Sequence, residues 1–140
     1  MTHQKIQLWL LRVRSEGHEV LILKTRADRG EFWQPVTGKV EAGESIEAAA
    51  VREGVEETGY DLTGLVKRLG FEFEFESRWG GKCRETVFYA ILPQDQAAQD
   101  YKLSHEHQAE EWTTLTEALP KIQFKSNQEA LIKLRSKIYA

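Results

Sequence analysis

The sequence has very little cysteine, methionine and proline, with one Cys, one Met and three Pro in 140 residues. Because Cys83 is the only cysteine, an internal disulfide and a zinc site built from several cysteines are both excluded. No apolar run approaches the roughly 20 residues that a membrane-spanning helix needs. The chain leads straight into a strand-like segment and shows no signal peptide, so we expect a cytoplasmic protein.

An excess of either charge is also missing, since 19 Lys and Arg stand against 22 Asp and Glu, a net charge of -3. Such a chain has no basic excess that would attract nucleic acid or an acidic membrane, which favours a small-molecule partner. The apolar share of 41% is that of an ordinary globular protein. No repeat or Pro-rich linker divides the chain, so we expect one domain over residues 1–140. The sequence does not indicate an oligomeric state.

Apolar and alternating segments predict strands over residues 6–13, 19–25, 32–36, 65–76, 86–92 and 109–113. Turn residues between the first two strands predict a hairpin. Helices are expected over residues 44–58, after Thr114 and from Ser126, where capping residues precede apolar positions. Ser45 is expected to cap the first helix and Gly59 to end it. Strands interleaved with helices predict an α/β (α+β) fold, a mixed sheet sandwiched between α-helices.

One face of the helix expected over residues 44–58 gathers negative charge. Glu53, Glu56 and Glu57 fall within about a 100° arc, because each residue turns an α-helix by about 100°. Arg52 lies at the edge of this arc. The opposite side, which we expect to pack against the sheet, carries Ala48, Val51 and Val55.

This acidic face is unfavourable for a helix considered alone. Like charges at these spacings cost about 0.2–0.5 kcal/mol per pair, and the helix dipole repels carboxylates near the C-terminus by about 0.3–1 kcal/mol. Gly54 costs about 1 kcal/mol relative to alanine. A solvated acidic face is one interpretation. The other is a site for a hard divalent cation, Mg²⁺ or alternatively Mn²⁺, shared with substrate phosphates.

The segment before the helix favours the cation site. Residues 37–43 are expected to form a loop that contains Gly38 and Gly43. Glycines let backbone groups approach a metal or a phosphate closely. The same loop delivers Glu44 to the start of the helix, where it can support the site.

Together these residues resemble the Nudix box, a signature that runs here from Gly38 to Tyr60. Its glycine and charged positions are all present at the expected spacing, namely Gly38, Glu44, Arg52, Glu53, Glu56 and Glu57. One departure is Gly54, where the family usually has an aliphatic residue. This departure concerns packing rather than chemistry.

The resemblance implies the Nudix fold and a Mg²⁺-dependent hydrolase that cleaves a phosphoanhydride bond in a nucleoside-triphosphate-like substrate. It implies that Arg52 orients the carboxylates. The general base in this family often lies outside the box, and Glu106 is our candidate for the base or for an extra metal ligand. An ordinary loop carboxylate is the alternative for Glu106. The metal ligands that the resemblance implies are Gly38, Glu53, Glu56 and Glu57.

Residues 32–38, with the sequence FWQPVTG, resemble one branch of the family, the dihydroneopterin triphosphate pyrophosphatases, which are often labelled dATP pyrophosphohydrolases. This implies a nucleotide or pterin triphosphate as substrate and pyrophosphate as product. Trp33 is expected to stack on the ring or, alternatively, to be a core residue. Lys24, Arg26 and Lys39 are candidates for phosphate contacts, with ordinary surface charge as the alternative.

Two other functions remain open. One is hydrolysis of dinucleoside polyphosphates, nucleotide sugars or capped RNA, although the net negative charge opposes long RNA as a ligand. The other is a non-catalytic nucleotide-binding module. The complete set of Arg52 and the three helix glutamates argues against a pure binder, which has no need of so unfavourable a cluster.

Overall fold

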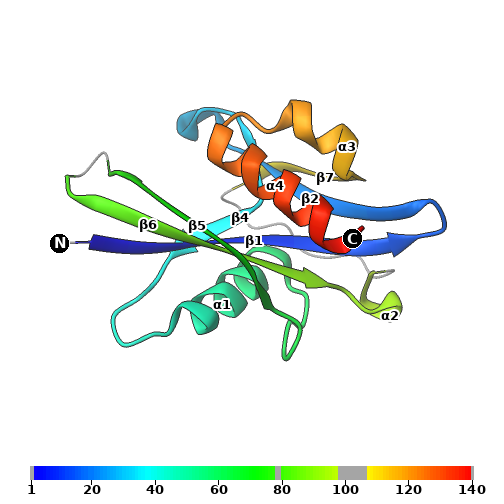
Figure 1. Ribbon diagram of the computed structural model, residues 1–140, viewed down its shortest axis with the longest axis horizontal. Helices are drawn as coiled ribbons and strands as arrows, with labels where there is room; N and C mark the ends of the chain where they lie inside the picture. Colours follow the sequence, from blue (N-terminus) through cyan, green and yellow to red (C-terminus); the bar gives the residue numbers. More distant parts are fainter. Residues whose placement is uncertain (1, 78–79, 98–106, 140) are drawn as a thin grey trace.

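The computed structural model describes residues 2–77, 80–97 and 107–139, which form a mixed sheet between helices. The strands are β1 Thr2–Arg14, β2 Gly17–Thr25, β3 Trp33–Gln34, β4 Val36–Lys39, β5 Lys67–Glu76, β6 Lys82–Ile91 and β7 His107–Thr114. The α-helices are α1 Ile46–Thr58, α2 Gln94–Ala97, α3 Leu115–Ala118 and α4 Lys125–Ile138, and single 3₁₀ turns occupy Ala27–Arg29 and Leu119–Lys121. Figure 1 shows α1 below the sheet and α3 and α4 above it, which confirms the predicted fold class.

The long strand β1 organises the sheet, whose main order is β3-β2-β1-β6-β5. Its first half pairs antiparallel with β4, with Ile6 opposite Gly38, and its second half pairs antiparallel with β2. The predicted hairpin of the first two strands is therefore confirmed. On its other side β1 runs parallel to β6, with Lys5 opposite Glu85. This parallel pairing brings residues 80 positions apart together at the end of the sheet nearest β4.

Alternation along β1 divides the core into two layers. Leu8 and Leu10 belong to the layer that also contains Ala49 and Ala50 of α1. Trp9 and Leu11 belong to the other layer, because successive side chains of a strand point to opposite faces. That second layer is completed by Leu115 of α3 and by Ala130, Leu131 and Leu134 of α4.

The two ends of α1 are those that the sequence predicted. The Ser45 hydroxyl accepts a hydrogen bond from the Ala48 amide at 3.1 Å, and Gly59 ends the helix with φ 78°. The predicted packing side was wrong for Ala48 and Val55, which are exposed, whereas Val51 packs partly buried against the core layer. The side chains that are buried instead belong to Ala49, Ala50, Glu57 and Thr58, together with the glycine at position 54. The arc that carries the glutamates therefore turns partly toward the protein body.

Gly54 lets α1 approach the sheet closely. A Cβ at this position would lie 2.3 Å from Leu62 Cδ1 and 2.7 Å from Leu8 Cδ2. We expect Gly54→Ala to lower the free energy of unfolding by about 1 kcal/mol, because overpacking costs more than the gain in helix propensity. Urea denaturation measures the change, and Ala48→Gly at an exposed position reports the propensity effect alone. A Gly54→Ala protein more stable than the wild type would show that the packing is not tight.

Other elements also differ from the prediction. Residues 37–39 belong to β4 and not to a loop, because the extended β1 pairs with them. Helix α4 begins at Lys125 with Phe124 at its N-cap, not with Ser126 as the cap. Helix α2 was not predicted. Among the described residues, no helix has the length and apolar character needed to cross a membrane.

Candidate active site

Arg52 lies at the centre of the acidic cluster. Its Nε is 2.7 Å from Glu44 Oε2, and its Nη1 is 2.9 Å from Glu53 Oε1 and 3.3 Å from Glu56 Oε2. Its Nη2 donates to the carbonyl of Lys39 at 2.9 Å. One guanidinium thus ties α1 to β4 and to the segment between them.

Glu44 and Glu53 have different electrostatic environments. Hydrogen bonds from Arg52 and from the Glu41 amide lower the pKa of Glu44, so its carboxylate stays ionised as an anchor of the loop. Burial raises the pKa of Glu53, with Glu56 adding to this effect and Arg52 opposing it. An additional cation beside Glu53 would therefore be stabilising.

Glu53 lies against the backbone of β4 and next to Glu57 of its own helix. A Cβ on Gly38 would lie 2.1 Å from Glu53 Cδ, so only glycine leaves room for this carboxylate. Glu57, one helical turn further on, is 3% exposed, and its carboxyl group lies beside that of Glu53. The Gly38 backbone and two inward-facing carboxylates thus lie side by side.

The donor set fits a hard divalent cation, although no complete coordination shell is formed. Within the described ranges, no group of three or more acidic, histidine or cysteine side chains is arranged to hold a metal ion. Glu53 and Glu56 are paired with Arg52 instead. The side chain of Glu56 is 58% exposed and has room to turn toward a cation. Carboxylate and carbonyl oxygens are the ligands that Mg²⁺ and Mn²⁺ prefer, and glycine at position 38 leaves space for them.

A cavity of about 620 Å³ adjoins the cluster. It lies between β1, β4, β5, β6 and the start of α4. Thr37 and Lys39 line it, while Gly38 between them meets Glu53 of the cluster. Four of its other lining residues are aromatic, namely Phe32, Phe73, Phe75 and Phe124. The cavity and the carboxylates are therefore neighbours across β4.

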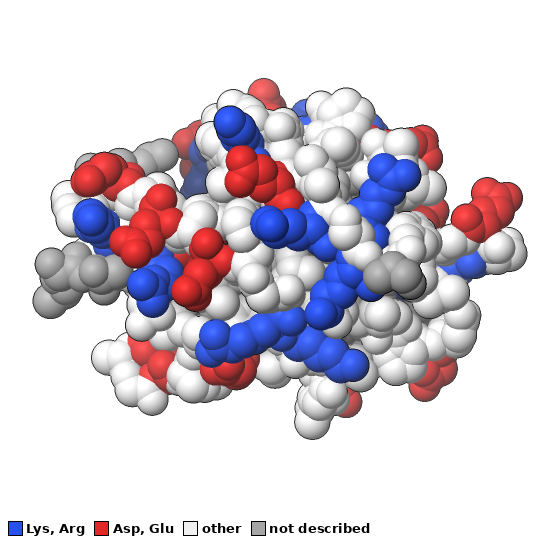
Figure 2. Space-filling view, in the orientation of Figure 1, with Lys and Arg blue, Asp and Glu red and all other residues white. Residues whose placement is uncertain are grey.

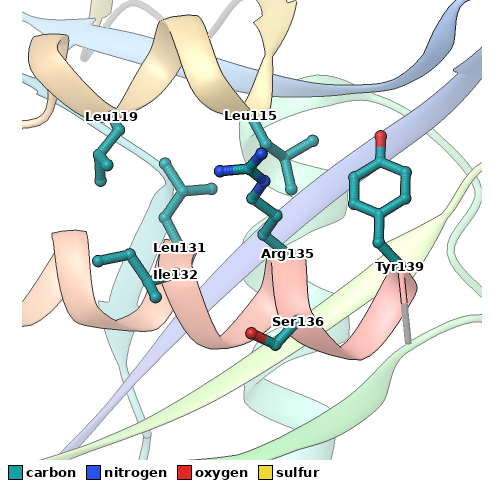
Figure 3. Close-up of a pocket in the computed structure, with 7 residues that line it drawn as sticks. All are labelled: Leu115, Leu119, Leu131, Ile132, Arg135, Ser136 and Tyr139. Carbon is teal, nitrogen blue, oxygen red and sulfur yellow. The ribbon is translucent and has the colours of Figure 1, made fainter.

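A second hollow, of about 290 Å³, is a weaker candidate. Figure 3 shows Leu119 near Leu131 and Ile132 of α4, and Leu115 near Arg135 of the same helix and Tyr139 at its end. Its lining is mostly aliphatic and carries no carboxylate. None of its lining residues belongs to α1, to β4 or to the segment between them, whereas Thr37 and Lys39 of β4 line the larger cavity. We therefore assign the site to the larger cavity.

Both signs of charge are present on the face that carries α4. Figure 2 shows Lys and Arg side chains across the middle of this face and acidic ones gathered near the hairpin of β5 and β6. Strand β5 supplies Glu72, Glu74 and Glu76 there, and β6 supplies Lys82 and Arg84. The described part of this face is thus not the continuous basic surface that nucleic-acid binding requires.

The structure brings some of the predicted substrate contacts to the cavity and not others. Lys39 lines it. Trp33 packs half-buried against the core layer beneath α4, and Lys24 is its neighbour in the sheet. Arg26 is exposed in the turn after β2. Glu106 lies outside the described residues.

Sequence reasoning missed the buried polar residues beside the cavity. Gln7 is fully buried, and Glu85 and Asn127 are 5% and 6% exposed. Gln7 and Glu85 each stand in an apolar strand, where a polar side chain is uncommon and needs a partner. A polar residue within an apolar strand was therefore a visible signal in the sequence. Its hydrogen-bond partners could not be identified, because Gln7, Glu85 and Asn127 lie far apart in the chain.

The sheet between helices, with an arginine-bridged glutamate cluster beside an aromatic cavity, defines a domain of the Nudix type. The NUDIX domain pattern matches residues 5–134, and the chain belongs to this family. Two of its relatives, one named a tetraphosphatase and the other a putative diphosphatase, are hydrolases, which supports an enzyme acting on phosphoanhydride bonds.

Two relatives are similar to this chain over most of its length. The chain is 34% identical over 115 residues to the asymmetrical bis(5′-nucleosyl)-tetraphosphatase of Rattus norvegicus, covering 81% of this chain and 76% of the rat protein. It is also 34% identical to an octanoyltransferase of Myxococcus xanthus, covering 90% of this chain but only 35% of that protein's length.

Two solved structures share the fold. The Ap4A hydrolase of C. elegans superposes with a TM-score of 0.84 at 24% identity, covering 98% of both chains. The dihydroneopterin triphosphate pyrophosphohydrolase of E. coli superposes with a TM-score of 0.77 at 27% identity, covering 91% of both chains. The predicted family and its suspected branch are therefore supported by a structural neighbour, which does not by itself identify the substrate.

Proposed function

We propose that this domain hydrolyses the triphosphate of a flat heterocyclic ring between the α and β phosphates, with Mg²⁺ or Mn²⁺ as cofactor and pyrophosphate as product. The observation that carries the proposal is the position of Gly38. The side of Gly38 where a side chain would stand meets Glu53 of the acidic cluster. Its neighbours Thr37 and Lys39 line the aromatic cavity. Successive side chains of a strand point to opposite faces, so a ligand with its ring in the cavity would reach the carboxylates by carrying its phosphates past β4 at Lys39.

The acidic cluster would hold the cation. Glu53, Glu56, Glu57 and the carbonyl of Gly38 are the proposed ligands. When bound, the cation supplies charge neutralisation on the departing pyrophosphate and lowers the pKa of water. Arg52 keeps the carboxylates in place, and Glu44 fixes Arg52 through two hydrogen bonds, 2.7 and 3.1 Å long.

The cavity would hold the ring. Phe32 and Phe124 meet edge to face with their centroids 4.8 Å apart and form one wall. Aromatic walls favour flat rings by stacking. We therefore assign ring stacking to these phenylalanines, because Trp33 is not among the residues that line the cavity. Lys39 stands where it can contact a phosphate, whereas the contacts proposed for Lys24 and Arg26 would need the ligand to reach beyond the cavity.

A substrate panel tests the proposal. Dihydroneopterin triphosphate, the four deoxynucleoside triphosphates, diadenosine tetraphosphate and a nucleotide sugar would be compared at equal concentration with Mg²⁺, and the products separated by ion-exchange chromatography. We expect a triphosphate with a two-ring heterocycle to give the highest kcat/KM. Faster cleavage of a nucleotide sugar than of any triphosphate would contradict the proposed substrate class.

Asymmetrical cleavage of dinucleoside tetraphosphates is the second candidate. The similarity to the rat tetraphosphatase over 76% of that protein favours it. The two candidates share the acidic cluster and differ in whether a second nucleoside improves the substrate. A diadenosine tetraphosphate kcat/KM well above that of every triphosphate would select this second function.

The general base is the least constrained part of the proposal. We keep Glu106 as the candidate, on the motive that a carboxylate just before β7 resembles a segment near the site in this family. Glu106→Gln is expected to lower kcat by about 10²–10⁴-fold with little change in KM, because a base acts in the transition state. Steady-state kinetics across the pH range measure both constants, with Glu110→Gln in β7 as a control. An unchanged kcat at every pH would remove Glu106 from the mechanism.

A further inference from the structure

The amide of buried Gln7 has its orientation fixed by a tryptophan. The indole Nε1 of Trp9 donates to Gln7 Oε1 at 2.6 Å. An indole N–H can only donate, so the oxygen of the Gln7 amide must face it. The amide nitrogen of Gln7 therefore points the other way, toward Glu85 and Asn127.

That nitrogen in turn fixes two residues of the cavity lining. Gln7 Nε2 donates to Glu85 Oε2 at 2.7 Å and to Asn127 Oδ1 at 2.9 Å. Both residues line the aromatic cavity. Since Gln7 uses one oxygen of each, Glu85 presents an acceptor oxygen to a ligand and Asn127 presents its amide donor. The cavity thus offers an acceptor and a donor in fixed positions.

We infer that Glu85 and Asn127 select rings with a 2-amino-4-oxopyrimidine edge, as in guanine and pterins, over adenine. Such an edge carries a ring N–H and an amino group, which donate to a carboxylate, and beside them a carbonyl, which accepts from an amide. Adenine presents a ring nitrogen lone pair in place of the N–H, which the carboxylate of Glu85 would repel. The inference rests on the proposed function for the placement of the phosphates, but ring selection depends only on the cavity.

The surroundings of Glu85 agree with a role in binding. A carboxylate that is 5% exposed and meets one amide donor is costly to bury, and added N–H donors from a ligand would offset that cost. Phe73 and Phe75 of β5 line the cavity with it. Burial raises the pKa of Glu85, while Gln7 and Lys5 oppose the rise, so a mildly alkaline pH keeps the carboxylate ionised during a measurement.

Binding of non-hydrolysable analogues tests ring selection without relying on catalysis. The α,β-methylene analogues of dGTP and dATP would be titrated by calorimetry into the wild-type protein with Mg²⁺ at mildly alkaline pH. We expect the guanine analogue to bind about 10- to 100-fold more tightly, the effect of hydrogen bonds to a charged group. Equal affinities, tighter binding of the adenine analogue, or no measurable binding of either would overturn the inference.

Two variants locate the selection in the named residues. Glu85→Gln keeps its oxygen on Gln7 and turns an amide donor toward the ligand, so we expect it to abolish or reverse the preference for guanine. Asn127→Asp, which removes the amide donor, should weaken guanine binding more than adenine binding. Glu72→Gln, an exposed glutamate of β5, is the control and should keep the wild-type ratio. A Glu85→Gln protein that folds and keeps that ratio would overturn the inference.

The rates of dGTP and dATP hydrolysis separate this inference from the proposed function. Hydrolysis of both at equal kcat/KM, with equal binding of the analogues, would leave the proposed function standing and overturn ring selection. A guanine preference in binding without any hydrolysis of triphosphates would support ring selection and overturn the proposed function.

Discussion

Glu56→Gln and Glu57→Gln are each expected to lower kcat of the Mg²⁺-dependent hydrolysis by about a thousandfold, while the metal-free protein keeps or gains thermal stability. A metal ion contributes several kcal/mol of charge stabilisation in the transition state, and about 1.4 kcal/mol corresponds to a tenfold change in rate. The side chain of Glu56 is 58% exposed, so its amide variant removes a charge without opening the core. Glu57→Gln keeps the shape of a side chain that is only 3% exposed.

The stability result distinguishes a metal site from a solvated acidic face. Loss of the Glu56 charge relieves its repulsion of Glu53, so the melting temperature without metal should not fall. Glu47→Gln is the matched control, since Glu47 lies on the same helix and pairs with Arg68 away from the cluster. Calorimetry and steady-state kinetics on the three variants give both quantities. If Glu56→Gln and Glu57→Gln retained the turnover of the Glu47→Gln control, the assignment of the metal ligands would be wrong.

Gly38→Ala is expected to lower kcat by about a hundredfold with little loss of stability. The added Cβ would lie 2.1 Å from Glu53 Cδ, and the end of the glutamate side chain can move away while the backbone stays. Such a shift moves a proposed metal ligand, and a displacement of about 1 Å at an active site can cost about a hundredfold in rate. Steady-state kinetics should therefore show the loss of kcat, while urea denaturation should show a nearly unchanged free energy of unfolding.

A double variant tests the cause of that loss. Glu53→Asp shortens the carboxylate by one methylene and makes room for the Cβ of Gly38→Ala. We expect the double variant to lose less activity than the product of the two single losses, a coupling that only neighbouring sites show. Independent effects of the two changes would indicate that Gly38→Ala acts on the backbone and not through Glu53.

Local patterns in the sequence were sufficient for most elements of the fold. The ends of α1 were predicted because Ser45 and Gly59 act through the backbone of their own helix. The first hairpin was predicted because its turn residues lie directly between the two strands that they join. The packing side of α1 was wrong, because periodicity alone assigns acidic residues to the solvent. In the structure Glu57 is buried, Glu53 lies against Gly38 of β4, and Val55 is exposed.

The cavity could not be predicted from local patterns. Its polar residues meet across 78 positions between Gln7 and Glu85 and across 120 between Gln7 and Asn127. The parallel pairing of β1 with β6 and the docking of α4 bring them together, and neither follows from a single segment. Lys39 was named as a candidate because it lies within the box, and in the structure it lines the cavity. Ring stacking and a core position were both open for Trp33. The structure packs it against the core, whereas Phe32 beside it in the chain lines the cavity.

Phosphate release from dGTP and from dihydroneopterin triphosphate, measured with and without added inorganic pyrophosphatase, tests the central claim most directly. We expect no phosphate without the coupling enzyme and two phosphates per nucleotide with it. When a chelator replaces Mg²⁺, ion-exchange chromatography, which needs no coupling enzyme, should show the triphosphate intact. Phosphate released without the coupling enzyme, together with a diphosphate product, would contradict cleavage between the α and β phosphates. Full activity in the chelator would contradict the metal site formed by Glu53, Glu56 and Glu57.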